Sequence, residues 1–238
     1  MFDFALIVVV FLLAGFSKGL IGLGLPTIAM ALLTLLLSPA EAAALLLLPS
    51  FVTNIVQIAP AREAWRLTLR LWPMLLGVGL GTALGGFLWG GFGGRYGMVL
   101  LGTALAAYGA LGLLAWRPAW PERAGLVVGT ATGALTAATG VFVIPAVPWL
   151  QGIGLARDEL VRALGLAFLV STLALGVLLG GSGALDTARM LTSALALLPA
   201  LLGQALGARL RGRLSEASFK RVLFAGLLAL GTAIALSG

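Results

Sequence analysis

The chain has 238 residues, of which 61% are hydrophobic and only 10% are charged. A soluble domain carries about 25% charged residues, so this composition excludes an ordinary water-soluble protein and indicates an all-α polytopic membrane protein. The net charge of +7 is spread over loops between apolar segments, as expected for arginines that orient a membrane protein. We therefore expect membrane lipid as the surroundings and no nucleic-acid partner.

Cysteine and histidine are both absent from the sequence. Their absence excludes disulfides, a cysteine nucleophile and the most common general base and metal ligand. An intramembrane enzyme would lack an obvious acid–base set. We expect no enzyme, no catalytic residues, no cofactor and no metal.

The first apolar segment, residues 4–37, contains Lys18 as its only charge. As one helix it would be about 50 Å long, which exceeds the hydrocarbon core of about 30 Å. The glycine-rich stretch AGFSKGLIGLGLPT (14–27) predicts a break between two limbs, roughly 4–17 and 26–37. Because neither limb would cross comfortably, we expect a re-entrant hairpin that enters and leaves by the same face.

Three membrane-crossing helices are predicted after this hairpin. Ser38, Pro39 and Glu41 form the signature of a capped helix start, and that helix extends to about residue 59. Two further spans are expected at about 71–89 and 96–116.

The second half of the chain repeats this order, beginning with a second interrupted segment at 125–150. The clearest local match is between the segments 71–86 and 196–211. It aligns Pro73 with Pro199, Gly77 with Gly203 and Gly81 with Gly207, and these glycines predict close helix packing. We predict one integral-membrane domain made of two repeats, 1–116 and 125–238, joined by a cytoplasmic linker at 117–124.

Loop charges predict the orientation of these repeats. Four loops, 62–70, 117–123, 157–162 and 209–221, hold 12 of the 15 lysines and arginines. They share one face if both interrupted segments are non-crossing hairpins and the other six spans cross. By the positive-inside rule this face is cytoplasmic, so both termini are predicted to be periplasmic in a cell inner (plasma) membrane protein. The two repeats are then inverted, and their hairpins enter from opposite faces.

The first hairpin is the leading candidate for a binding site. Gly15, Gly19, Gly22 and Gly24 permit a tight reversal, and unwound backbone N–H groups at membrane depth can bind an anion. The alternative is a purely structural kink. Lys18 is either a counter-charge for an anion or a side chain that reaches the interface or a backbone carbonyl.

Polar side chains on other predicted helices extend this candidate site. Ser50, Thr53, Asn54 and Gln57 share one face of the first crossing helix, either lining a substrate path or joining helices. Threonines of the second hairpin either line the site or bond to their own helix carbonyls. The predicted substrate-binding residues are Lys18, Gly19, Gly22, Gly24, Ser50, Asn54, Gln57, Thr136, Thr139, Gly140, Ser171 and Gln204.

Glu41 and Asp158 occupy matching helix starts in the two repeats. They are candidates for proton coupling, with helix capping as the alternative. No carboxylate falls clearly in the middle of a predicted span.

These features together resemble the TauE/SafE-type sulfite exporter family, also called the toluene-sulfonate uptake permeases. Members of that family typically show a glycine-rich stretch followed by a proline and a polar-containing second helix. Here the stretch comprises Gly15, Gly19, Gly22, Gly24 and Pro26, although the family's glycine triplet is reduced to Gly22-Leu23-Gly24.

The resemblance implies secondary transport of a small anion, such as sulfite, an organosulfonate or a related sulfur-containing or carboxylate anion. Transport would proceed by alternating access, with the site between the two hairpin tips. An anion channel and the membrane subunit of a multi-component permease are the alternatives. Proton or sodium coupling, and a monomer or a homodimer, are left open.

Overall fold

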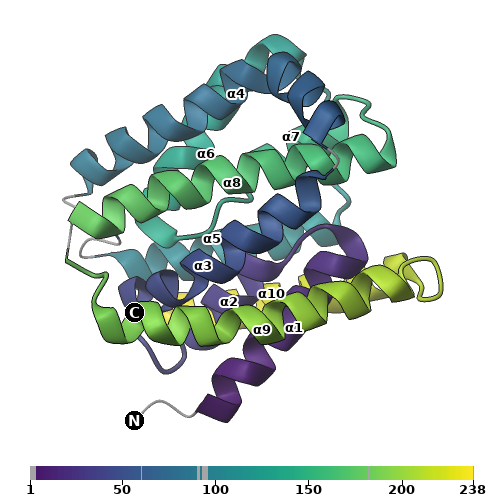
Figure 1. Ribbon diagram of the computed structural model, residues 1–238. Coiled ribbons are helices and arrows are strands. Elements are labelled where there is room, and N and C mark those ends of the chain that lie inside the picture. The colour runs from purple at the N-terminus through teal and green to yellow at the C-terminus, as the bar shows by residue number, and fades with distance from the viewer. Residues whose placement is uncertain (1–3, 60, 90–91, 93–95, 182, 238) are drawn as a thin grey trace.

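The computed structural model describes residues 4–59, 61–89, 92, 96–181 and 183–237, and the extreme termini lie outside these ranges (Figure 1). Within the described residues the regular structure is helical. The helices are α1 (Phe4–Ile21), α2 (Leu25–Leu33), α3 (Pro39–Ile58), α4 (Ala61–Leu88), α5 (Gly97–Leu113), η1 (Glu122–Ala124), α6 (Gly125–Thr139), α7 (Ala146–Gly152), α8 (Arg157–Gly181), α9 (Thr187–Leu210) and α10 (Glu216–Ser237).

Six helices in the described part of the chain are long and apolar enough to cross a membrane: α1, α3, α4, α8, α9 and α10. Helix α5 is apolar but has only 17 residues. The many exposed leucines on the outer helices, such as Leu198 and Leu202 of α9, are consistent with a lipid environment. The predicted class, an all-helical polytopic membrane protein, is confirmed.

The first limb of the N-terminal segment is longer than predicted. Helix α1 continues through Gly15 and Gly19 to Ile21 instead of ending near residue 17. Both glycines stay helical because they contact α9: a Cβ atom at either one would overlap a backbone carbonyl oxygen of α9, that of Ala200 or Gln204. With 18 residues α1 is about 27 Å long, and it is long and apolar enough to be a candidate membrane span, unlike the shorter limb expected from the sequence.

The chain reverses between α1 and α2 at two glycines. Gly22 and Gly24 have φ values of +79° and +113°, which side chains other than glycine rarely adopt. The Ser17 hydroxyl donates a 2.9 Å hydrogen bond to the Leu23 carbonyl and thereby holds the turn against α1. Helix α2 has nine residues, including Pro26 in its first turn, and leads to the capped start of α3.

The predicted helix start at Ser38 is confirmed. The Glu41 N–H donates to Ser38 Oγ at 3.3 Å, and the Ser38 N–H donates to Glu41 Oε2 at 3.1 Å, which completes the capping box.

The second interrupted segment forms a smaller hairpin. Helix α6 ends at Thr139, the next residue Gly140 has a φ of +69°, and α7 returns with only seven residues. The Ala146 N–H donates to the Thr132 hydroxyl at 3.1 Å, so the side chain of one limb satisfies the free backbone at the start of the other.

Corresponding helices of the two halves pack in corresponding ways. Helix α1 lies along α9 and runs in the same direction, α6 lies along α4 in the same direction, and α5 packs on α10. A Cβ atom at Gly81 would overlap the Thr130 carbonyl oxygen, and one at Gly207 would overlap that of Phe16. The close packing predicted from the two glycine series is therefore confirmed.

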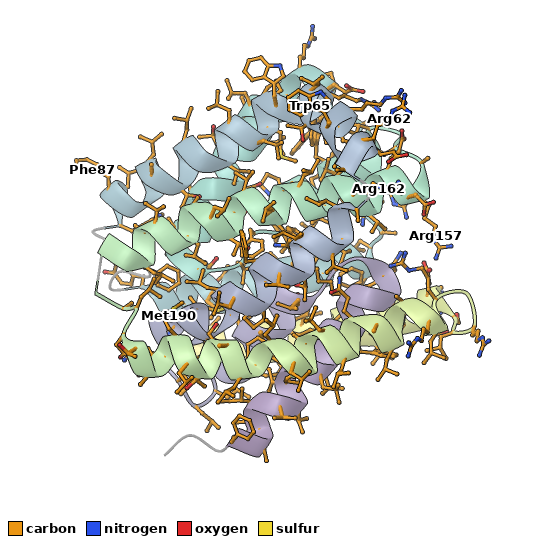
Figure 2. The ribbon with its side chains drawn as sticks, viewed as in Figure 1. Arg62, Trp65, Phe87, Arg157, Arg162 and Met190 are labelled. Carbon is orange, nitrogen blue, oxygen red and sulfur yellow. The ribbon has the colours of Figure 1, made fainter. Side chains whose placement is uncertain are left out.

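Arginines gather at one end of the helical bundle. Arg62, Arg157 and Arg162 lie at that end in Figure 2, whereas Phe87 and Met190 lie at the other. Helices α3 and α9 end at the arginine end, whereas α4 and α8 begin there. The bundle thus has one strongly basic end.

Candidate functional site

Lys18 is buried inside the bundle, with 2% of its surface exposed. It lies on the last turn of α1, and its ammonium donates a 2.9 Å hydrogen bond to Thr53 Oγ1 and another to Asn54 Oδ1 on α3. Among the described residues no carboxylate forms an ion pair with it. In the described part of the chain, the Lys18 ammonium is therefore held by neutral oxygen atoms.

The polar face of α3 joins α1 and the turn after it to α8. The Asn54 amide also donates to Thr172 Oγ1 of α8 at 3.3 Å. The Gln57 amide donates to the Gly22 carbonyl at 3.0 Å and to the Val161 carbonyl at 2.8 Å. This face therefore joins helices, as one of the two sequence interpretations held, and it fixes the turn after α1 against α8.

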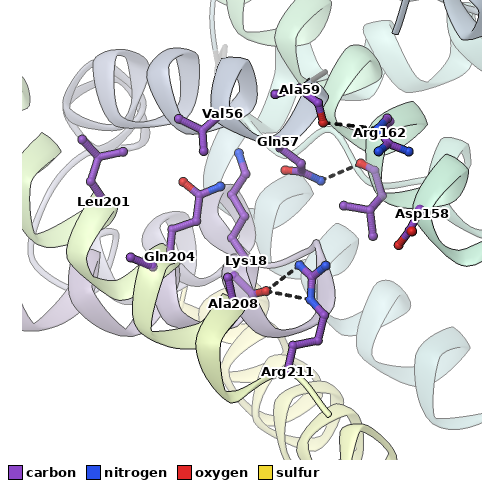
Figure 3. A pocket seen from close by; sticks show the side chains of 13 residues that line it. Lys18, Val56, Gln57, Ala59, Asp158, Arg162, Leu201, Gln204, Ala208 and Arg211 are labelled. Atoms are coloured by element: carbon purple, nitrogen blue, oxygen red, sulfur yellow. Dashed lines mark hydrogen bonds between the residues drawn. The ribbon is translucent and has the colours of Figure 1, made fainter. Parts of the chain in front are cut away.

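A cavity of about 520 Å³ lies beside Lys18 and extends to the arginine end. It lies between α1, α3, α8 and α9, and Figure 3 shows Gln204 and Gln57 reaching toward it from different helices. Its charged lining residues are Lys18, Arg162, Arg211 and Asp158. Three cations against one carboxylate make this an electrostatically positive cavity, which favours an anion.

Arg211 connects this cavity to the end of α1. Its guanidinium donates to the Gly19 carbonyl at 2.6 Å from Nη2 and at 3.2 Å from Nε, which caps a free carbonyl at the helix end. Burial lowers the pKa of the Arg211 guanidinium, and the positive charge of Arg157 acts in the same direction. An arginine still keeps its charge at neutral pH, so the cavity stays positive.

Two buried amide oxygens near the cavity have no hydrogen-bond donor among the described residues: Gln57 Oε1 and Gln204 Oε1. The Gln204 amide nitrogen is engaged, since it donates to the Thr53 carbonyl at 3.1 Å. Buried polar atoms normally have a partner, so both oxygens are available to accept a hydrogen bond from a molecule in the cavity.

The structure brings together only part of the predicted site. Four of the predicted residues line the cavity: Lys18, Gly19, Gln57 and Gln204. Asn54 does not line it but accepts a hydrogen bond from Lys18, which does. The remaining predicted residues are not among its lining residues: Gly22 and Gly24 in the turn, Ser50, Thr136, Thr139, Gly140 and Ser171. The hydroxyls of Ser50 on α3 and Ser171 on α8 are buried and have no partner among the described residues, but neither residue lines this cavity.

The second hairpin makes no contribution to this cavity. The Thr136 and Thr139 hydroxyls donate to the carbonyls of Thr132 and Leu135 at 2.8 and 2.7 Å, within their own helix. Gly140 lies against Met30 of α2 rather than against the turn after α1. The cavity is thus formed at the tip of one hairpin and not between two tips.

The two matched carboxylates occupy different surroundings. Glu41 caps α3 at the end of the bundle opposite the arginine end, where it forms an ion pair with Arg189 at 3.1 Å. Asp158 lines the mouth of the cavity at the arginine end. Only Asp158 is therefore placed to act on a charge inside the cavity.

Arg162 and Arg211 were not predicted to be site residues. Both lie in segments that were predicted to be basic loops. The positive-inside rule already explains arginines in such loops, so nothing in the sequence indicated that these two face inward. Only the packing of α9 along α1 and of α8 against α3 shows that both also line the cavity.

A helical bundle with a buried cation and a positive interior cavity defines an integral membrane protein with a polar internal site. The family model for the sulfite exporter TauE/SafE family matches residues 7–234, nearly the whole chain, so the protein belongs to this family of membrane transporters. No curated protein and no solved structure matched the chain.

Proposed function

We propose that this protein is a secondary transporter that moves a small anion by alternating access and binds it in the cavity beside Lys18. The anion would be sulfite, an organosulfonate or a related sulfur-containing or carboxylate anion. Relative to the expectation from the sequence, the proposal moves the site from between two hairpin tips to the tip of the first hairpin. It assigns no enzymatic step to the protein.

The buried ammonium of Lys18 carries this proposal. A charged side chain inside a membrane protein costs several kcal/mol unless it is paired, so such residues usually mark a substrate or ion path. Neutral partners leave the charge of Lys18 uncompensated, and Arg162 and Arg211 add positive charge around the same cavity. A bound anion would supply the missing counter-charge.

Alternating access is supported by the difference between the two ends of the bundle. At the arginine end the cavity has exposed residues at its mouth, including Asp158 and Ala59. At the opposite end the starts of α3 and α9 are held together by the Glu41–Arg189 ion pair. A cavity open at one end and closed at the other is typical of one state of an alternating-access transporter.

The proposed mechanism includes the interpretation that the two halves of the chain are inverted repeats. Helices α1 and α6 correspond to each other in the two halves and enter from opposite ends. Each packs along a helix of the other half, α1 along α9 and α6 along α4, and α9 and α4 also correspond to each other. If each repeat adopted the conformation that the other repeat has in this structure, the present cavity would close and an equivalent cavity would open at the opposite end.

Flux in proteoliposomes tests the proposal. Purified protein should give saturable uptake of labelled sulfite or of an organosulfonate, and Asn54→Ala should lower it about tenfold by removing one hydrogen bond to Lys18. Thermal unfolding in detergent establishes that the variant is folded. Unchanged flux in a folded Asn54→Ala protein would argue against this site.

The two alternatives predict different measurements. An anion channel would give unitary currents in planar bilayers, whereas the proposed transporter gives none. A permease subunit would need a co-purifying partner for flux, whereas the proposed transporter works as the isolated chain.

A further inference from the structure

A second polar pocket, of about 240 Å³, is separate from the cavity beside Lys18, which we call the transport cavity. This second pocket lies between α7, the end of α5 and the start of α10. It faces the arginine end, since the start of α10 is tied to the start of α8 by the Arg157–Glu216 ion pair. Its charged lining residues are Arg117, Lys220 and Arg221, and its lining includes no carboxylate. The transport cavity shares none of these three residues.

The charge of this pocket is largely uncompensated. Among the described residues Arg117 and Arg221 form no ion pair, and Lys220 has Glu216 only at 3.9 Å. Tyr108 also lines the pocket; it is 3% exposed, and its buried hydroxyl has no hydrogen-bond partner among the described residues. Three cationic side chains lining one pocket, together with a buried hydroxyl that has no partner among the described residues, suit an anion with several acceptor oxygens, such as a phosphate group.

The surroundings of the pocket favour a lipid phosphate over a soluble one. Leu114 and Val222, which flank the pocket residues in sequence, are 76% and 73% exposed. Trp116 lines the pocket and stacks edge-on against Trp120, with ring centroids 5.6 Å apart. Tryptophans beside exposed aliphatic side chains are typical of the membrane–water interface.

We propose that this pocket binds the phosphate of an anionic phospholipid, with Arg117, Lys220 and Arg221 as its cationic ligands and Tyr108 as a hydroxyl donor. The acyl chains lie along the exposed leucine surface at the end of α5. Basic pockets between membrane helices commonly bind anionic head groups in this way. The inference is independent of the identity of the transported anion.

Native mass spectrometry of the detergent-purified chain tests this inference, with phosphatidylglycerol as the probe and phosphatidylcholine as the zwitterionic comparison. Arg117→Gln/Arg221→Gln removes two cations from the pocket. Arg123→Gln/Arg213→Gln removes two exposed arginines that do not line it and is the matched control. At about 1 kcal/mol per cation, the pocket variant should bind phosphatidylglycerol roughly 30-fold more weakly, whereas the control should bind like the parent.

Three results would overturn the inference. Equal phosphatidylglycerol binding by the pocket variant and the control would show that the pocket is not the site. Equal binding of phosphatidylcholine would show that charge is not recognised. Displacement of the lipid by millimolar inorganic phosphate would assign the pocket to a soluble anion instead.

Discussion

The hydroxyl of Ser193 on α9 donates a 2.8 Å hydrogen bond to the carbonyl oxygen of Leu45 on α3. That carbonyl has no helical donor, because the residue four positions later is Pro49, which has no N–H. The same hydroxyl accepts from the Leu48 N–H at 3.3 Å. One buried serine therefore repairs the proline interruption and joins α3 to α9 at the end opposite the arginines.

Ser193→Ala should lower the free energy of unfolding by about 1–3 kcal/mol, because it leaves a buried carbonyl without a donor. The measurement is the thermal midpoint of the purified protein in detergent. Thr192→Ala on the same helix is the control, since its hydroxyl bonds only to the carbonyl of Ala188 in its own helix. Equal midpoints for the two variants would contradict the assigned role of Ser193.

Gly207→Ala should destabilise the bundle by about 1–3 kcal/mol, because the added methyl group would overlap the Phe16 carbonyl oxygen of α1 and push the two helices apart. Gly79→Ala on α4 is the matched control, since a Cβ atom there meets nothing within 4 Å. Thermal unfolding should place the control at or above the parent protein, and a Gly207→Ala protein as stable as the control would refute the close contact.

Asp158→Asn should increase the apparent affinity for the transported anion, because it removes the negative charge from the lining of a positive cavity. We expect KM for flux to fall roughly three- to tenfold, the effect of a charge pair near a protein surface. Glu41→Gln is the control, because Glu41 pairs with Arg189 at the opposite end. A KM that responds equally to both changes would show that the cavity does not bind the anion.

The orientation in the membrane gives a further prediction. If the arginine end is cytoplasmic, a reporter fused after Ser237 should be periplasmic, and one inserted at about Glu216 should be cytoplasmic. These two residues lie at opposite ends of α10. The reverse assignment would overturn the proposed topology.

The sequence was sufficient to predict the class of fold, the capped start of α3 and the close contacts of Gly77, Gly81, Gly203 and Gly207, because composition and local spacing determine them. It could not predict where α1 ends. Gly15 and Gly19 suit a turn as well as a close helix contact, and only the presence of α9 decides between these roles.

The candidate site was predictable in part for a similar reason. Lys18 is recognisable because it is the only charged residue in the apolar segment 4–37. The helical periodicity of α3 places the polar residues of that helix on one face. The contribution of Arg211 depends on where α9 ends relative to Gly19, more than 190 positions away in the chain, which local patterns do not encode.

The most direct test of the central claim compares the chain's two lysines, Lys18 and Lys220. Lys18→Met and Lys220→Met each remove one positive charge, but only Lys18 lines the transport cavity. The measurement is organosulfonate binding by isothermal titration calorimetry to each folded variant in detergent. The account predicts at least tenfold weaker binding for Lys18→Met and unchanged binding for Lys220→Met. Unchanged binding by a folded Lys18→Met protein would contradict it.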